Sequence, residues 1–199
     1  GSFFWHAVQQ NPPGSRFPRE SRSCYPTAGA KDFPQLHPVV IDIEATRAQK
    51  PALSPPDVPA QSLLWPGDPL LYWDEAGHII YEWQARGYSE IALYEADPET
   101  GKAQVRVREA LKPNVAVTSS ALRNAPEWGG YLAISERSDW AQLYLIKRGE
   151  APNSGKAITR GNWEVLTIEH ITKDGPALIT GIGREAGGNP YFKSLYRVT

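Results

Sequence analysis

Residues able to do chemistry are few in this chain of 199 residues, and their spacing does not assemble a catalytic set. The Gly-x-Ser-x-Gly motif, which presents a nucleophilic serine on a strained turn, occurs nowhere in the sequence. No motif supplies a serine or aspartate partner to any of the four histidines, His6, His37, His78 and His170. Because a nucleophile and its base must lie within hydrogen-bond reach, we expect structural or solvent-exposed histidines and no catalytic residue.

The sequence also offers no set of ligands for a metal or a cofactor. Cys24 is the single cysteine, so the chain can form neither an intrachain disulfide nor a thiolate cluster around a metal. No activating context surrounds Cys24, and we expect an idle thiol. The adjacent acids Asp74 and Glu75 lie in a predicted hairpin turn, where aspartate commonly bonds the backbone. We therefore expect no metal and no cofactor.

Composition narrows the possible partners. The net charge is −1, with 41% hydrophobic and 22% charged residues, which is ordinary for a globular protein. This near-neutral balance gives no electrostatic case for binding nucleic acid or an anionic membrane. No stretch approaches the roughly 20 apolar residues that span a bilayer. We expect no nucleic-acid partner and no membrane segment in this chain.

The sequence contains a repeat, and the strands that it predicts would set the positions of these residues. A bulky side chain recurs every 52 residues in the series Leu36, Tyr88, Trp140 and Phe192, and an apolar one in the series Val39, Ile91, Leu143 and Leu195. Around each position, apolar residues alternate with polar ones, which predicts a strand buried on one face. A period near 50 with several strands in each unit is typical of a β-propeller blade.

Turn signals divide the chain into four blade units, approximately residues 1–48, 62–110, 116–161 and 162–199. No convincing helix is predicted. We predict an all-β fold: one partial β-propeller domain over 1–199 with about three to four four-stranded antiparallel blades. Open strand edges would then need cover from missing blades or from a second copy of the chain. The chain contains no methionine and opens directly in strand-like sequence, so we expect a piece of a longer polypeptide.

Four motifs, in order along the chain, resemble the N-terminal β-propeller of dipeptidyl peptidase IV-like serine peptidases, a family of the prolyl oligopeptidase clan. The motifs are Tyr25-Pro-Thr-Ala-Gly-Ala with Val39-Val-Ile-Asp, Ile134-Ser-Glu-Arg-Ser-Asp-Trp-Ala-Gln-Leu-Tyr-Leu, Ile158-Thr-Arg-Gly-Asn-Trp-Glu-Val and Gly187-Gly-Asn-Pro-Tyr-Phe-Lys-Ser-Leu-Tyr-Arg-Val. They span nearly the whole chain. The resemblance implies that this chain is the C-terminal half of such a propeller.

The resemblance also implies a function. In the family an eight-bladed propeller caps an α/β-hydrolase domain whose Ser–Asp–His triad removes dipeptides from peptide N-termini. We expect this chain to be a non-catalytic propeller segment that lines the cavity and gates peptide access to a hydrolase domain absent from the chain. The alternative is a stand-alone propeller module that binds proteins without peptidase activity. A nucleophile motif downstream of Thr199 would decide between them. The compartment is open from the residues, and the resemblance favours the periplasm or the extracellular space.

Site residues follow from the same resemblance. The family docks the substrate ammonium on adjacent glutamates, and no Glu-Glu occurs here, so that pair is expected upstream of this chain. A family arginine on a loop reaches substrate, and Arg123 occupies the comparable stretch without the flanking aromatics. Arg123 is therefore either a substrate contact or a solvated loop arginine. Trp163 is expected to pack between blades, and Glu136 to pair with Arg137.

Overall fold

The computed structural model describes residues 2–26, 29, 40–41, 71–85, 87–115, 122–173 and 175–199, with the backbone alone at 2–5 and 23–26. This part contains thirteen strands, one 3₁₀ turn and no α-helix, so the chain is all-β as predicted. The chain divides into two compact units, Gly1–Gln35 and Leu36–Thr199. The predicted strand over 37–43 lies almost wholly outside the described residues.

The first unit is a β-hairpin made of β1 (Ser2–Gln9) and β2 (Arg19–Pro26). The antiparallel register runs from Ser2 opposite Pro26 to Gln9 opposite Arg19. Residues 6–22 are exposed, with the exception of Pro12. Because a two-stranded ribbon has no core of its own, this unit gains little stability from burial within itself.

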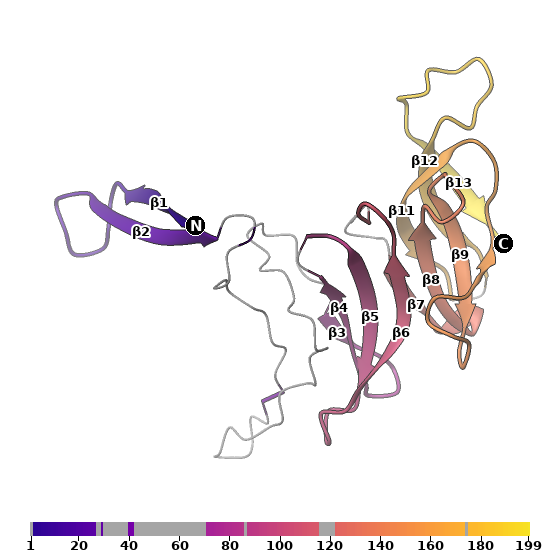
Figure 1. Cartoon of the computed structure of the whole chain (residues 1–199), viewed down its shortest axis with the longest axis horizontal. Helices are drawn as coiled ribbons and strands as arrows, with labels where there is room; N and C mark the ends of the chain where they lie inside the picture. Colours follow the sequence, from indigo (N-terminus) through magenta and orange to yellow (C-terminus); the bar gives the residue numbers. More distant parts are fainter. Residues whose placement is uncertain are drawn as a thin grey trace. The chain divides into compact units, whose positions relative to one another are not determined.

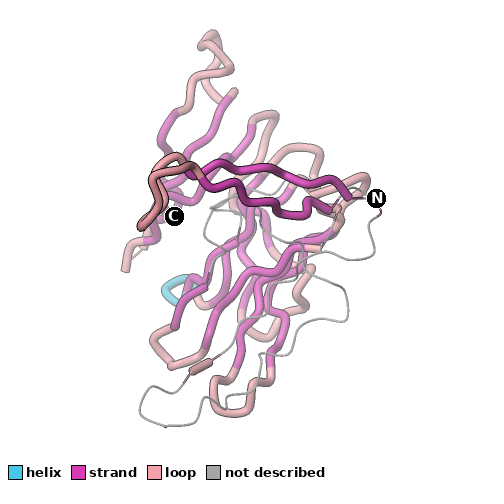
Figure 2. Tube along the Cα trace, turned by 90° about the vertical axis from the view of Figure 1, so that its left-hand side faces the viewer, coloured by secondary structure: helices cyan, strands magenta, loops and turns pink. Residues whose placement is uncertain are grey.

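The second unit contains three antiparallel sheets in which strands consecutive in the chain are neighbours (Figure 1). Blade I consists of β3 (Leu71–Trp73), β4 (Ile79–Gln84), β5 (Glu90–Ala96) and β6 (Ala103–Ala110). Blade II consists of β7 (Leu122–Ala125), β8 (Gly130–Ser135), β9 (Gln142–Lys147) and β10 (Lys156–Ala157), with the 3₁₀ turn η1 (Pro126–Trp128) between β7 and β8. Blade III consists of β11 (Glu164–Ile171), β12 (Ala177–Ile182) and β13 (Ser194–Val198). These sheets form a partial β-propeller (Figure 2).

The first hairpin of blade I is built as its sequence predicts. Asp74 accepts backbone hydrogen bonds through Oδ1 from Ala76 at 3.0 Å and from His78 at 2.8 Å. Gly77 has a φ of 83°, in the left-handed region that favours glycine. The turn residues therefore fix the register of β3 against β4, in which Tyr72 lies opposite Ile80.

Strand β7 does not follow from the sequence pattern. It pairs with β8 from Leu122 opposite Ala133 to Ala125 opposite Gly130. The segment has four residues and none of them is β-branched, so its own residues carry little strand signal. Its partner β8 supplies the backbone hydrogen bonds that hold it. The placement of Arg123 on a loop was therefore wrong, because Arg123 lies within this strand.

The middle strands of blades I and II are buried on both faces, whereas the alternating sequence pattern predicts burial of one face only. In β4, Ile79, Tyr81 and Trp83 pack in one apolar cluster on blade I. Ile80 points to the other face and joins a larger cluster that spans all three blades. In β4 the residues between the alternating apolar positions are therefore buried or half-buried as well.

Burial along the 52-residue series depends on where each blade lies. Ile91 of blade I and Leu143 of blade II are fully buried, whereas Leu195 of blade III is 63% exposed. Among the described residues no sheet follows blade III, and β13 is its edge strand. Equivalent positions of the repeat are therefore buried where the next blade covers them and exposed where the described chain ends.

Candidate functional site

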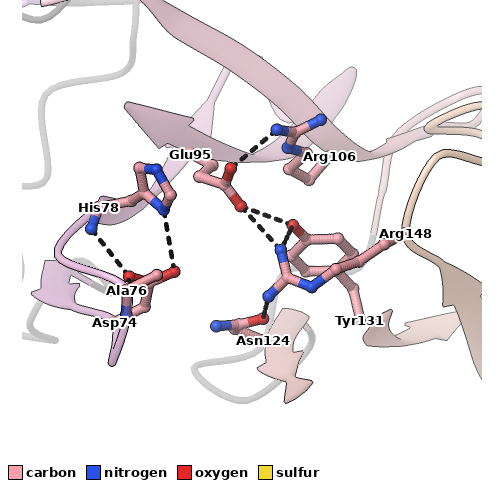
Figure 3. A network of polar contacts seen from close by, with 8 residues as sticks. All are labelled: Asp74, Ala76, His78, Glu95, Arg106, Asn124, Tyr131 and Arg148. Atoms are coloured by element: carbon pink, nitrogen blue, oxygen red, sulfur yellow. Dashed lines mark hydrogen bonds and ion pairs between the residues drawn. The ribbon is translucent and has the colours of Figure 1, made fainter. Parts of the chain in front are cut away.

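A polar network built around the buried carboxylate of Glu95 connects blades I and II (Figure 3). Glu95 lies on β5, and Arg106 of β6 donates from Nη2 to its Oε1 at 2.8 Å. Tyr131 of β8 donates its hydroxyl to Oε2 at 2.8 Å, and Arg148, just after β9, donates from Nη1 to the same oxygen at 3.1 Å. A buried carboxylate is tolerated only when it is paired in this way.

These donors decide the ionisation of Glu95. Burial alone would raise the pKa of the carboxyl group, but the hydrogen bonds from Arg106, Tyr131 and Arg148 outweigh it and lower the pKa below its ordinary value. Burial, and then the neighbouring Glu95 carboxylate, raise the pKa of the Tyr131 phenol. At neutral pH the network therefore contains a carboxylate, two guanidinium ions and a neutral phenol.

Arg148 carries the network further into blade II. Its Nη1 also donates to the Tyr131 hydroxyl at 2.9 Å, and its Nη2 donates to Oδ1 of Asn124 at 3.1 Å. The guanidinium lies over the Tyr131 ring, 5.1 Å from the ring centroid, at cation–π distance. One arginine thus holds residues from β5, β7 and β8 in a fixed arrangement.

His78 and Asp74 lie beside the network without a hydrogen bond to it among the described residues. The Nδ1 atom of His78 lies 3.5 Å from Oδ2 of Asp74. Asp74, His78 and Glu95 together place possible metal-ligating atoms within 4.8 Å of one another. However, both oxygens of Glu95 already accept hydrogen bonds from arginine, and two guanidinium ions repel a further cation. The chemistry of this cluster fits a turn and an ion-pair network, and we assign no metal to it.

Arg123 lies on β7, next in the chain to Asn124 of this network. It is partly buried, opposite Leu132 in the sheet, and its Nη1 donates to the carbonyl of Leu122 at 2.9 Å. Burial raises the pKa of the Glu82 carboxyl group, and the Gln84 amide and the Arg123 charge partly offset this.

Tyr72 of β3 is a further neighbour of Arg123. Burial raises the pKa of the Tyr72 phenol, while its hydrogen bond with the Asn124 backbone and the Arg123 charge oppose the rise. The structure thus places Glu82 and Tyr72 within the electrostatic influence of Arg123, which sequence reasoning missed. Both lie on strands that the sequence predicts, but the sequence gives no sign of this proximity.

A second polar contact joins blades I and II, and it corrects the predicted pairing of Glu136 with Arg137. Arg137 instead binds Glu109 of β6, from Nη2 to Oε2, while Glu136 is exposed. Residues 136 and 137 directly follow β8 in a turn. Arg137 is partly buried and reaches the neighbouring blade, whereas its sequence neighbour is exposed.

Trp163, predicted to pack between blades, is buried beside the strands of blade III. It is 6% exposed and belongs to the cluster that spans the three blades. Its Nε1 donates to the carbonyl of Arg160 at 2.8 Å, and its ring lies 5.2 Å from that of Tyr196. A Cβ atom on Gly181 would lie 2.7 Å from the indole, so only glycine fits beside the ring.

The other residues singled out by type lie apart from this site. His6 contacts Glu20 on the exposed hairpin, and His170 is exposed on β11. Cys24 lies opposite Phe4 in the backbone register of β2 and β1. His37 lies outside the described residues. In the part of the chain that is described, no helix combines the length and apolar character needed to cross a bilayer.

Comparison with known proteins agrees with this architecture. The model of the dipeptidyl peptidase IV (DPP IV) N-terminal region matches residues 5–199. Dipeptidyl peptidase 4 of Sus scrofa is 26% identical over 202 aligned residues, covering 92% of this chain and 24% of that protein. The crystal structure of Porphyromonas gingivalis dipeptidyl peptidase 4 shares the fold, with a TM-score of 0.65 at 19% identity over 98% of this chain and 26% of that one.

The chain therefore spans about a quarter of the length of these relatives. The family model covers all but the first four residues. With this match, the ordered motifs and the three antiparallel blades, the chain belongs to the family of the dipeptidyl peptidase IV N-terminal region.

Proposed function

We propose that this chain is a non-catalytic segment of the propeller of a dipeptidyl peptidase IV-like serine peptidase. It lines the cavity of the propeller and gates the access of peptides to a hydrolase domain carried elsewhere in the parent protein. The observation that carries the proposal is the family match over residues 5–199. The acyl transfer itself, through a serine nucleophile and an oxyanion hole, belongs to that other domain.

The interblade contacts suit such a wall. Blades of a propeller surround a central channel, and a wall that selects peptides by size needs neighbouring blades held at a fixed distance. Glu95 with Arg148, and Glu109 with Arg137, each bind one blade to the next through a charge-assisted hydrogen bond. Peptide substrate, the remaining blades and the hydrolase domain are the partners that this proposal requires.

Arg123 is the residue of this chain that we propose contacts substrate. It lies on the first strand of blade II, beside Tyr72 on the first strand of blade I. A substrate carbonyl or carboxylate would accept hydrogen bonds from the guanidinium. In the parent enzyme, Arg123→Ala is expected to raise KM about tenfold and leave kcat nearly unchanged, since the lost hydrogen bond acts on bound substrate and transition state alike. The exposed Arg160, replaced by alanine, is the control.

The test of the main proposal uses the full-length gene product. Hydrolysis of an Ala-Pro chromogenic amide, together with labelling of the serine by a fluorophosphonate, supports a proline-directed dipeptidyl peptidase. Labelling without hydrolysis retains the serine hydrolase and rejects the dipeptidyl specificity. Absence of both signals rejects the proposal and leaves a propeller that binds proteins without peptidase activity.

Self-association is proposed for the isolated chain. Blade III has three strands in the described part, with β13 at its edge and Leu195 exposed on it. An open strand edge pairs readily with another chain. Light scattering of the isolated 199-residue chain is expected to give at least a dimer, and a stable monomer at about 100 μM would contradict this.

A further inference from the structure

A cavity of about 340 Å³ lies at the edge of blade II, between the turn that precedes β9 and the connection from β10 to β11. Its lining shares no residue with the Glu95 network. The volume is near the lower end of the range of about 300–1,000 Å³ that is typical of small-molecule sites. Two aromatic side chains line it, Trp140, which is 39% exposed, and Tyr144, which is 6% exposed. The cavity therefore has the size and the aromatic wall of a site for one small ring.

A buried amide with an unused acceptor lines the same cavity. Gln142 is 2% exposed, and its Nε2 donates to the carbonyl of Trp163 at 2.6 Å and to that of Gly161 at 3.1 Å. Because the amide is planar, these two bonds turn Oε1 away from both carbonyls. Oε1 is itself buried and accepts no hydrogen bond within the described residues. A buried carbonyl oxygen without a donor costs free energy, so this position favours a ligand that donates a hydrogen bond.

Two hydroxyl groups of the lining need an acceptor instead. Oγ of Ser138 accepts from the Tyr144 hydroxyl at 2.9 Å, and Oγ1 of Thr159 accepts from the backbone N–H of Leu143 at 2.8 Å. Each of these hydroxyls also has a proton to donate, and the described part of the chain supplies an acceptor to neither. The cavity therefore suits a ligand that donates to Gln142 and accepts from Ser138 and Thr159.

We propose that this cavity binds a pyranose sugar ring. A sugar hydroxyl both donates and accepts hydrogen bonds, so neighbouring hydroxyls of one ring can satisfy Oε1 of Gln142 and the hydroxyls of Ser138 and Thr159 together. The face of the ring that carries C–H groups packs on the exposed indole of Trp140. The inference stands on the cavity alone, goes beyond the proposed role in a peptidase and is independent of peptidase activity.

Other ligands satisfy these groups less well. A carboxylate or phosphate ion only accepts hydrogen bonds and would leave Oε1 of Gln142 without a donor. A divalent metal ion seeks several oxygen or nitrogen ligands, and no carboxylate lines the cavity within the described residues. An alkyl ammonium ion can donate, but it would leave both hydroxyl protons without an acceptor. A water molecule could bond to Oε1 but would leave the indole of Trp140 uncovered.

The test is saturation-transfer NMR on the full-length protein with the methyl glycosides of glucose, mannose, galactose and N-acetylglucosamine. At least one of them is expected to bind with a Kd of about 1 mM. Derivatives of that glycoside with one hydroxyl replaced by fluorine keep a weak acceptor and lose the donor. Fluorine at the position that donates to Gln142 is expected to weaken binding about tenfold, because it leaves the buried Oε1 unpaired. This series needs no change to the protein.

Variants locate the site. Trp140→Ala is expected to weaken binding of the methyl glycoside about tenfold, because the ring loses its aromatic wall. The control Trp73→Ala removes an indole that is 59% exposed on β3, outside the cavity, and is expected to change the Kd less than twofold. Ser138→Ala removes an exposed hydroxyl of the lining and is expected to weaken binding about threefold.

The proposal is overturned if no methyl glycoside gives a saturable signal by about 20 mM, if every fluorinated derivative binds like the parent sugar, or if the two tryptophan variants weaken binding equally. A blocked dialanine peptide that binds more tightly than every glycoside would assign the cavity to a peptide and overturn the sugar. The matching disaccharide distinguishes the source of the sugar. An affinity more than about threefold above that of the methyl glycoside supports the end of a glycan chain, and an equal affinity supports a single sugar.

Discussion

Replacing Tyr131 with phenylalanine removes one oxygen atom from the centre of the Glu95 network. The Tyr131 side chain is 1% exposed, so water cannot take the place of its hydroxyl. That hydroxyl donates to Glu95 at 2.8 Å and accepts from Arg148 at 2.9 Å. A hydrogen bond to a charged group contributes about 1.5–3 kcal/mol. Because both arginines still bind Glu95, no charge is left unpaired, and we expect a loss of about 2 kcal/mol in the free energy of unfolding.

Urea unfolding followed by tryptophan fluorescence measures this loss. With a typical urea dependence of about 2 kcal/mol per molar, the midpoint is expected to fall by about 1 M. The matched control is Tyr196→Phe, whose hydroxyl contacts the exposed Glu185 at 3.2 Å. Tyr196→Phe is expected to lower the free energy of unfolding by less than about 0.5 kcal/mol. If Tyr131→Phe lowers the midpoint no more than Tyr196→Phe does, the network does not stabilise the junction of the blades.

The pH dependence gives the same prediction a second readout. The pKa of Glu95 is lower in the folded chain than its ordinary value of 4.5. Its stabilising contribution is therefore fully present above the unfolded pKa and is lost as the pH falls through the folded pKa. Tyr131→Phe removes one cause of that lowering. The difference in unfolding free energy between the variant and the parent is expected to shrink between about pH 5 and pH 3.

Three further perturbations test the packing between blades. Glu95→Gln is expected to flatten the dependence of the urea midpoint on pH in the acid range, since the group that titrates is gone. Arg137→Lys is expected to lower the free energy of unfolding by about 2–3 kcal/mol, because lysine lacks the fork that binds Glu109 and two carbonyls together. Gly181→Ala is expected to lower the free energy of unfolding by about 1–3 kcal/mol, because the added methyl group meets the Glu164 carbonyl oxygen and the Trp163 ring, and the urea midpoint measures this loss.

Controls for these variants lie elsewhere in blade III. Arg184→Lys changes an exposed arginine that stacks on aromatic rings. We expect it to lower the free energy of unfolding by less than about 0.5 kcal/mol. Gly188→Ala meets its nearest backbone atom at 3.3 Å, a tight but adjustable contact. If Arg184→Lys destabilises as much as Arg137→Lys, or Gly188→Ala as much as Gly181→Ala, the contacts named above are not the cause.

The sequence predicts the strands well because two local signals agree. Alternation marks β4, β5 and β9, and turn residues such as Asp74 and Gly77 mark the ends of their hairpins. Strand β7 escapes prediction because its order comes from pairing with β8 rather than from its own residues.

The site is harder to predict because its partners are far apart in the chain. Glu95 and Arg148 are 53 residues apart, almost one repeat, so the two residues occupy nearly equivalent positions in neighbouring blades. That spacing was a signal that could have identified the pair. Glu82 and Tyr72 carry no such signal, since the charge of Arg123 acts on them only once blades I and II lie together.

The up-and-down order of the strands has a consequence for synthesis. Within blades I and II every sheet neighbour is also the next strand in the chain, so each blade can close soon after its last strand leaves the ribosome. The contacts that Arg137 and Arg148 make with blade I form later. Glu95 and Glu109 are translated with blade I, but Arg137 and Arg148 follow only with blade II. A newly made blade I therefore carries two acids that still lack their blade II partners, and these contacts are completed only when the next blade arrives.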